Sequence, residues 1–231
     1  MAVIVILKVW YNFGMNNRDY KEFAKNEIYH VYNRGVGKMN IFKDEEDFKV
    51  FLFRLKENLF PEIMKRKDLP KSAYRRKTLP PNSFDLISYC LMPNHFHLLI
   101  KQNSDISISA LILKLCGGFS KYFNKKHNRV GSLFQDKFKA VRIHRNEQLL
   151  WTSLYIHENP LKAEITDDLF KYKWSSYPDY AGLQNYNLCR KEIILGQFDS
   201  PKTYLNYFRM SENKKIQNKM IGCLDLLIDN E

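Results

Sequence analysis

Two histidines separated by one residue open an apolar run, and this pattern could bind a metal ion. His95 and His97 flank Phe96 in the segment 89–101, which has the apolar character of a buried β-strand. Side chains alternate between the faces of a strand, so both imidazoles project from one face and Phe96 from the other. Neutral imidazole binds divalent cations well. The alternative is that both histidines are half-exposed side chains with hydrogen bonds of their own, and spacing alone favours neither interpretation.

The Pro93-Asn94 pair directly before His95 favours the metal interpretation. Proline and asparagine are typical of a tight turn, so the strand begins sharply at the histidines. Residues of nearby loops and helices could then complete a coordination shell.

A tyrosine and an asparagine on a later helix could act on the same ligand. Helical periodicity extends over 146–160, and we expect this helix to end at Pro160, because proline disfavours helical geometry in the residue before it. Tyr155 and Asn159 are four residues apart and share one face of it. A hydroxyl and an amide oxygen could thus reach one metal or phosphate. A helical tyrosine can equally be a packing residue, so the role of Tyr155 stays open at this point.

The periodicity of the chain predicts the elements that position these side chains. It predicts strands over 27–35, 84–91 and 95–101, a turn and a fourth strand within 131–143 with Lys139 near the middle of that strand, and helices over 44–64, 107–126 and 146–160. Asp44 is a candidate N-cap, and Gly117-Gly118 is expected to interrupt the second helix. The basic, proline-containing stretch 65–81 is a predicted loop, whose charges either bind phosphates or are simply solvated.

The order of these elements predicts the fold class. Strand, helix, two strands, helix, strand is the order of an α+β protein of the ferredoxin-like, split β-α-β type. We expect a central antiparallel sheet with helices on one face, the other face being left for a ligand or partner.

Three regions are expected along the chain. Residues 1–25 are a predicted leader, 26–182 the catalytic domain, and 183–231 a C-terminal helical extension to which the sequence assigns no chemistry. Because residues 1–14 match no periodic pattern, we expect the printed sequence to begin upstream of the natural start. The apolar segment 1–8 is too short to span a bilayer and no signal-peptide pattern follows it, so we expect a cytoplasmic protein.

The composition indicates a nucleic acid as partner. The chain has 37 Lys and Arg against 25 Asp and Glu, a formal net charge of +12. A basic surface gains free energy from phosphate neutralisation and counterion release, whereas a membrane partner would call for a basic amphipathic helix that the pattern lacks. A basic, ribosome-like structural protein is the alternative. With 231 residues, 45% of them apolar, the chain is long enough for one full core and is not a disordered protein.

Five sequence blocks together resemble the REP-associated tyrosine transposases, a branch of the HUH (histidine, hydrophobe, histidine) single-strand DNA nucleases. In chain order they are YHVYNRG (29–35), YCLMPNHFHLLI (89–100), GSLFQDKFKA (131–140), SLYIHENPLKA (153–163) and WSSYPDY (174–180). The resemblance covers most of residues 26–182.

This resemblance implies a site and a reaction. His95 and His97 would be the HUH metal ligands, Asn159 the third ligand and Tyr155 the nucleophile. The better-known relatives from insertion sequences carry glutamine at the position of Asn159. The metal would be Mg²⁺ or Mn²⁺. The product would be a covalent 5′-phosphotyrosine with a free 3′-hydroxyl, formed without ATP on single-stranded DNA near hairpins of repetitive palindromic elements, by a monomer or homodimer.

The residues that would contact the DNA are less sharply defined. Basic groups could hold phosphates and aromatic rings could stack on unpaired bases. The candidates are Arg34, Lys139, Arg142, Trp174 and Tyr177. Each has a structural alternative, above all Trp174, which could anchor the tail to the core.

The sequence also allows two alternative functions. One is a DNA-hairpin-binding protein that has lost catalysis, against which the intact pair of histidines, Tyr155 and Asn159 argue. The other is an HUH nuclease of the replication-initiator or relaxase type, which shares the two histidines but places its tyrosine in a different motif.

Overall fold

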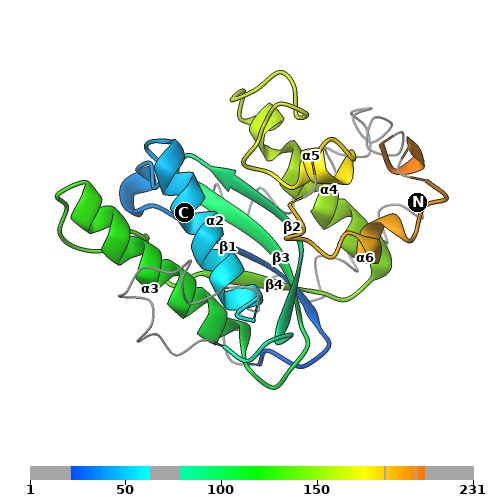
Figure 1. The fold of residues 1–231 in the computed structure, drawn as a ribbon, viewed down its shortest axis with the longest axis horizontal. Helices are drawn as coiled ribbons and strands as arrows, with labels where there is room; N and C mark the ends of the chain where they lie inside the picture. Colours follow the sequence, from blue (N-terminus) through cyan, green and yellow to red (C-terminus); the bar gives the residue numbers. More distant parts are fainter. Residues whose placement is uncertain (1–21, 63–78, 185, 201, 206–231) are drawn as a thin grey trace, which may run out of the picture.

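A four-stranded antiparallel sheet forms the centre of the molecule (Figure 1). The computed structural model describes residues 22–62, 79–184, 186–200 and 202–205. Its strands are β1 (Ile28–Arg34), β2 (Phe84–Met92), β3 (His95–Gln102) and β4 (Lys139–Ile143), in the spatial order β2-β3-β1-β4. Every neighbouring pair is antiparallel, and the predicted turn joins β2 to β3. The predicted α+β, split β-α-β class is confirmed.

Helices α2 (Glu45–Leu59) and α3 (Ile108–Lys126) cover one face of this sheet. Asp44 caps α2 as predicted, accepting a hydrogen bond from the Asp47 N–H at 3.1 Å. A short 3-10 helix, η1 (Val36–Lys38), follows β1. Phe96 projects into this layer and its ring lies 5.0 Å from that of Phe51 on α2.

The opposite face is not left open as expected. Helix α4 (Asn146–Lys162) packs against it, mainly over β2, and the short helices α5 (Tyr177–Tyr180) and α6 (Glu192–Leu195) lie beside α4 (Figure 1). The physical reason is that Leu99 and other apolar residues of β2 and β3 also point to this side and need cover. Residues on the two faces of the sheet therefore belong to two apolar cores. Phe96, Leu98 and Ile100 belong to the first core, with α2 and α3, and Leu99 belongs to the second core, with α4.

Two of the expected breaks do not occur. Helix α3 runs without interruption through Gly117-Gly118. Gly118 allows a close contact between the helices, because a Cβ at this position would lie 2.6 Å from Nη1 of Arg54 on α2. Helix α4 continues past Pro160 to Lys162. The proline stands in the last turn, where the Ala163 N–H still reaches the Asn159 carbonyl at 3.0 Å.

The predicted turn and strand within 131–143 are both present, but Lys139 is the first residue of the strand instead of lying near its middle. The chain before it turns, with Gly131 at a φ of 94° and the Ser132 hydroxyl donating to the Phe134 carbonyl at 2.6 Å. Local turn bonds therefore compete with strand pairing until Lys139.

The described part of the C-terminal extension packs onto the second core. Ile194 and Tyr204 are buried there together with Tyr155 of α4. The predicted loop 65–81 and the predicted leader fall largely outside the described residues, as does the end of the extension. Within the described ranges, no helix combines the length and the apolar character that a bilayer span requires.

Candidate active site

The rings of His95, His97 and Tyr155 meet on the face of the sheet that α4 covers. The centroids of the two imidazoles are 4.9 Å apart, and the Tyr155 ring lies 5.6 Å from that of His97 in an edge-on arrangement. The two histidines share one face of β3, as their spacing predicts. The structure therefore brings together side chains that are 58 to 60 positions apart in the printed numbering.

His95 is held at the start of β3 by the side chain of the residue directly before it. Its Nδ1 lies 2.6 Å from the Asn94 side-chain oxygen, which can only accept, so the ring donates from Nδ1. Asn94 is itself oriented, because its Nδ2 donates to the Lys38 carbonyl at 3.3 Å. Burial and the charge of Arg34 lower the pKa of His95 to about 4, against a hydrogen bond with Asn159 that raises it. The ring is therefore neutral at neutral pH.

His97 is completely buried and contacts a third histidine. Its Nδ1 lies 2.9 Å from Nε2 of His30 on β1, and its own Nε2 has no hydrogen-bond partner among the described residues. Burial, and then the charges of His95, His30 and Arg34, hold the pKa of His97 well below its usual range. His97 is thus also a neutral imidazole, with one ring nitrogen uncommitted.

Asn159 links the tyrosine helix to the first histidine. Its Nδ2 donates to the Tyr155 carbonyl one turn earlier, at 2.8 Å, and its side chain also bonds His95. On the same helix, the Lys162 ammonium lies 5.2 Å from the Tyr155 ring centroid and forms an ion pair with Glu158 at 3.1 Å. The amide and a positive charge are therefore both placed around the tyrosine.

These side chains fit a divalent cation. His95 and His97 are neutral and can offer lone pairs, and a buried Nε2 without a partner is a group that a cation would satisfy. Imidazole is a common ligand of divalent transition metals, and amide oxygens are ligands of Mg²⁺ and Mn²⁺. The chemistry of the donor set agrees with the predicted ligands His95, His97 and Asn159, which remain a prediction.

A pocket of about 170 Å³ opens beside His95. Its lining includes Tyr32, Arg34, His95, Gln135, Lys137 and Lys139. Two of the five predicted DNA contacts, Arg34 and Lys139, thus lie next to the histidines. Arg142, another of the five, pairs with Glu27, the residue before β1, through its Nε to Oε2 at 3.1 Å.

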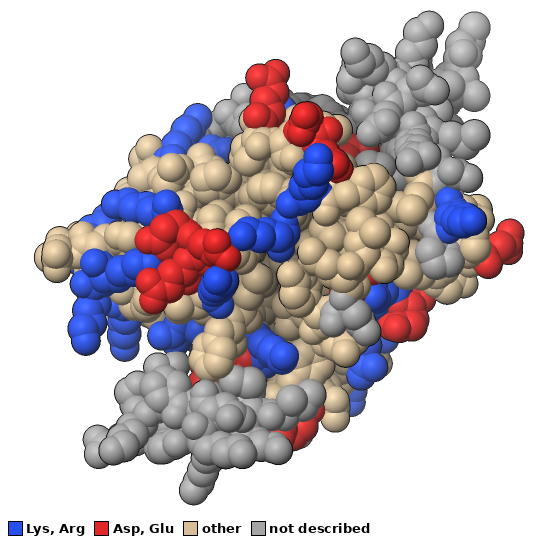
Figure 2. Space-filling view, turned by 45° about the horizontal axis from the view of Figure 1, so that its top comes forward, with Lys and Arg blue, Asp and Glu red and all other residues tan. Residues whose placement is uncertain are grey.

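The two predicted aromatic DNA contacts are placed in packing positions. The Trp174 ring stacks on Phe48 with centroids 4.5 Å apart, and Tyr177 is 3% exposed with its ring near His157. Base stacking by either ring stays a prediction, and it does not enter the proposal below. On the face that Figure 2 shows, Lys and Arg side chains are spread widely, and acidic side chains lie among them in several places.

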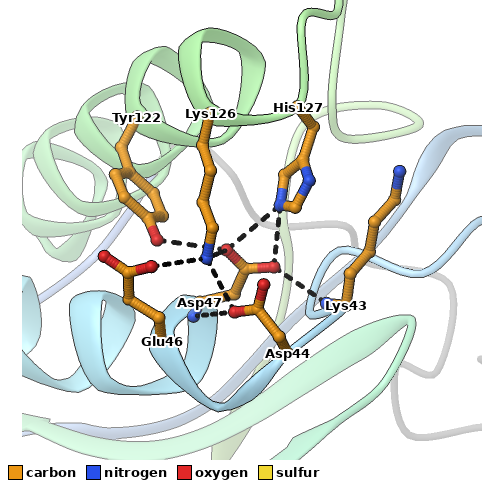
Figure 3. A network of polar contacts seen from close by, with 7 residues as sticks. All are labelled: Lys43, Asp44, Glu46, Asp47, Tyr122, Lys126 and His127. Atoms are coloured by element: carbon orange, nitrogen blue, oxygen red, sulfur yellow. Dashed lines mark hydrogen bonds and ion pairs between the residues drawn. The ribbon is translucent and has the colours of Figure 1, made fainter.

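The acidic group Asp44, Asp47 and His127 is a second place with metal-ligand atoms, all within 4.8 Å of one another (Figure 3). An ammonium group already lies there. Nζ of Lys126 is 2.7 Å from Asp44, 2.9 Å from Glu46 and 3.1 Å from Asp47. The carboxylates have their counter-charge from the protein, so we interpret this network as a structural link between the start of α2 and the end of α3.

The sequence placed Asn94 in the turn before His95, but it did not single out His30, which holds His97. His30 lies on the same face of β1 as Tyr32, and Tyr32 is directly opposite His97 in the sheet. The period-two pattern of β1 was visible in the sequence. The register between β1 and β3 was not, because tertiary pairing determines it.

A fourth histidine ties α4 to the chain that follows it, and this contact predicts acid sensitivity. His157 is fully buried, with Nδ1 3.0 Å from the Tyr204 hydroxyl and Nε2 2.7 Å from the Ser176 hydroxyl. Burial lowers its pKa from 6.5 to about 3. In the unfolded chain, His157 therefore binds a proton near pH 6.5, whereas in the folded protein it stays neutral down to about pH 3. The free energy of unfolding consequently falls as the pH drops from 6.5 towards 3.

We expect His157→Gln to be less sensitive to acid than the original chain. Between pH 7.5 and 5, the variant should lose about 2 kcal/mol less unfolding free energy, as follows from the pKa difference. Urea unfolding in the presence of EDTA measures this. Equal losses in both proteins would mean that His157 is not the neutral buried group described here.

Fold and site together define the class: an α+β protein that sets two histidines of one strand against a helical tyrosine. A family of sequences described as "Transposase IS200 like" matches residues 50–159, which contain the predicted nucleophile and all three predicted metal ligands. A search of curated proteins finds no match. The resemblance to tyrosine transposases is confirmed, and the family match indicates a DNA-processing enzyme with a transposase role.

Two solved structures are similar to this chain. One is a REP-associated tyrosine transposase bound to a REP hairpin, with 13% identity, a TM-score of 0.50, and coverage of 73% of this chain and 86% of the other. The other is a putative transposase from Deinococcus radiodurans R1, with 14% identity, a TM-score of 0.36, and coverage of 60% and 94%. At this identity the first likeness shows the fold.

Proposed function

We propose that this chain nicks and rejoins single-stranded DNA through a covalent 5′-phosphotyrosine at Tyr155. Its substrate would be DNA next to hairpins of repetitive palindromic elements, and His95, His97 and Asn159 would hold a divalent metal, Mg²⁺ or Mn²⁺. The family match and the REP-hairpin complex of the similar structure support the choice of substrate.

The observation that carries the proposal is the cluster of Tyr155 with His97 and His30, to which Asn159 joins His95. The tyrosine ring lies 5.6 Å from His97 and 6.0 Å from His30, and Asn159 connects the same helix to His95. Packing alone explains a tyrosine beside a sheet. It does not explain why three neutral imidazoles gather at that tyrosine, because burying polar rings costs free energy that an apolar cluster would avoid.

The reaction is a transesterification in two steps. The phenol oxygen of Tyr155 bonds to the scissile phosphorus while the bond from phosphorus to the 3′-oxygen breaks, and the phenol proton is passed on as the 3′-oxygen leaves as a hydroxyl. A 3′-hydroxyl later attacks the phosphotyrosine and releases the tyrosine. One ester bond replaces another in each step, so no ATP is consumed.

The residues of the chain place the reacting groups. Arg34 and Lys139 beside His95 would bind the phosphates that flank the cleavage point, and Lys162 puts a positive charge next to the phenol that loses its proton. When bound, a divalent cation would polarise the scissile phosphate and offset its charge.

A labelling experiment tests the proposal directly. The protein is incubated with single-stranded DNA that carries a palindromic hairpin from the host genome and a 3′ label, with Mn²⁺, with Mg²⁺ or with EDTA. The expected result is a labelled protein–DNA adduct that forms only with metal and maps to Tyr155 by peptide mass spectrometry.

Other outcomes would contradict the proposal in different ways. Cleavage without an adduct would exclude the covalent intermediate, and an adduct at another tyrosine would exclude the assigned nucleophile. Tight binding to many hairpins without any cleavage would support the alternative of a catalytically silent hairpin-binding protein.

A further inference from the structure

We infer that His30 is a positioning residue, whose Nε2 accepts the Nδ1 proton of His97 so that Nε2 of His97 is free to bind a cation. The inference rests on the metal site of the proposed function. It adds a residue to that site that touches neither the cation nor the DNA and acts through His97.

The geometry places the two rings in contact through these two atoms. Nε2 of His30 lies 2.9 Å from Nδ1 of His97, and the ring centroids are 5.1 Å apart with an interplanar angle of 21°. The rings are 1% and 0% exposed, so water cannot replace either partner from the surface. The hydrogen bond joins β1 to β3 and is fixed by the register of the central strands.

The position of a single proton in this hydrogen bond decides what His97 can do. A neutral imidazole carries one N–H, and a contact between two ring nitrogens needs one donor and one acceptor. If His30 donates, the proton of His97 is on its Nε2 and no cation can bind there; if His97 donates, the proton of His30 is on its Nδ1, and neither of these two nitrogens has another partner among the described residues. If His97 donates, its Nε2 is a bare lone pair. Cation binding therefore requires the second arrangement, and an acceptor on His30 makes that arrangement available.

The other predicted imidazole ligand is held in the same way, which supports the inference. Nδ1 of His95 donates to the side-chain oxygen of Asn94 at 2.6 Å. Both histidines are therefore held at Nδ1 by another side chain, and the second hydrogen bond of His95 goes to Asn159, the third predicted ligand. A packing role for His30 would not require its nitrogen to lie against the Nδ1 of His97.

Two substitutions distinguish the contribution of the His30 nitrogen from the contribution of its aromatic ring. His30→Phe keeps an aromatic ring in the stack and removes the acceptor, whereas His30→Gln keeps an acceptor at about the same distance from the backbone. His97→Ala is the control that removes the predicted ligand. If His30→Phe does not fold, His30→Leu, which also lacks an acceptor, takes its place. Melting in EDTA shows which variants are folded.

The measurement is a Mn²⁺ titration of each folded variant without DNA, followed by electron paramagnetic resonance of the free ion. Removal of a residue that supports a metal ligand typically lowers metal affinity by about 10- to 100-fold, so we expect His30→Phe to weaken Mn²⁺ binding by at least about 10-fold. Because His30→Gln keeps an acceptor, its affinity for Mn²⁺ should stay within about 3-fold of that of the original chain. The melting temperatures in EDTA should not follow this order.

The outcomes distinguish the inference from the proposed function. If His97→Ala loses Mn²⁺ binding while His30→Phe keeps it, His30 is only a packing residue and the inference fails alone. If His30→Gln is as weak as His30→Phe, the acceptor is not what matters, and the inference fails as well. If His97→Ala binds Mn²⁺ like the original chain, or the original chain binds none, the metal site of the proposed function is wrong.

Discussion

Replacement of Tyr155 by phenylalanine is expected to lower the rate of strand cleavage by at least about 10⁴-fold, the order of loss seen when a nucleophile is deleted. The variant lacks the oxygen that would bond to phosphorus. It keeps the ring, which is 4% exposed and packs edge-on against His97 and His30, so the fold should not change. Single-turnover cleavage of a labelled hairpin substrate measures the rate.

Tyr186→Phe is the matched control for this experiment. Tyr186 is 49% exposed and lies in the extension, and its replacement removes the same hydroxyl from the same residue type. It should cleave like the original chain. Hairpin binding by Tyr155→Phe, followed by fluorescence anisotropy, should be retained, because the phosphate contacts proposed for Arg34 and Lys139 are unchanged. Cleavage that survives in Tyr155→Phe would mean that another residue is the nucleophile.

The sequence predicts the scaffold of this site well, because the scaffold depends on local periodicity. The period-two pattern of residues 95–101 places His95 and His97 on one face, and the period of the later helix places Tyr155 and Asn159 together; the structure confirms both arrangements. These patterns are short-range, so they can be recognised without knowing what packs against them.

The parts that the sequence could not predict depend on contacts between distant segments. Nothing in 146–162 alone states which face of the sheet the helix covers, and α4 covers the face that was expected to stay open. The pairing of His30 with His97 depends on strand register. The glycines of α3 looked like a helix break, but the helix continues through them, and Gly118 lies where the Arg54 side chain of α2 comes close. Tertiary packing overrides local preference in each of these cases.

The α2 and α3 layer supports the site from behind, which gives the acidic network a function in stability. Phe96, between the two histidines, packs on Phe51 of α2, so β3 is held by this layer. The start of α2 is tied to the end of α3 by the buried carboxylate of Asp47. It accepts hydrogen bonds from the Lys43 N–H at 2.9 Å and the Tyr122 hydroxyl at 3.2 Å.

Asp47→Ala is therefore expected to lower the free energy of unfolding by about 3 kcal/mol, the usual cost of removing one partner from a buried ionic network. The Asp47 side chain is 0% exposed, and its loss leaves the Lys43 N–H, Tyr122 and His127 without their acceptor. Burial would lower the pKa of Lys126, but its hydrogen bonds, with Asp44 and Glu46 first, outweigh this and raise it. The Lys126 ammonium group thus stays charged in Asp47→Ala and has one carboxylate partner fewer.

Glu46→Ala is the matched comparison, because it also removes one carboxylate from Lys126 at a similar distance, 2.9 Å against 3.1 Å. Its side chain is 66% exposed, so we expect a cost of at most about 1 kcal/mol, as for exposed ion pairs. Urea unfolding of both variants at pH 7.5 measures the difference. If the two substitutions cost the same, burial does not strengthen this network, and the contact between α2 and α3 is held by the apolar packing of rings such as Phe51 and Phe119, whose centroids are 5.2 Å apart.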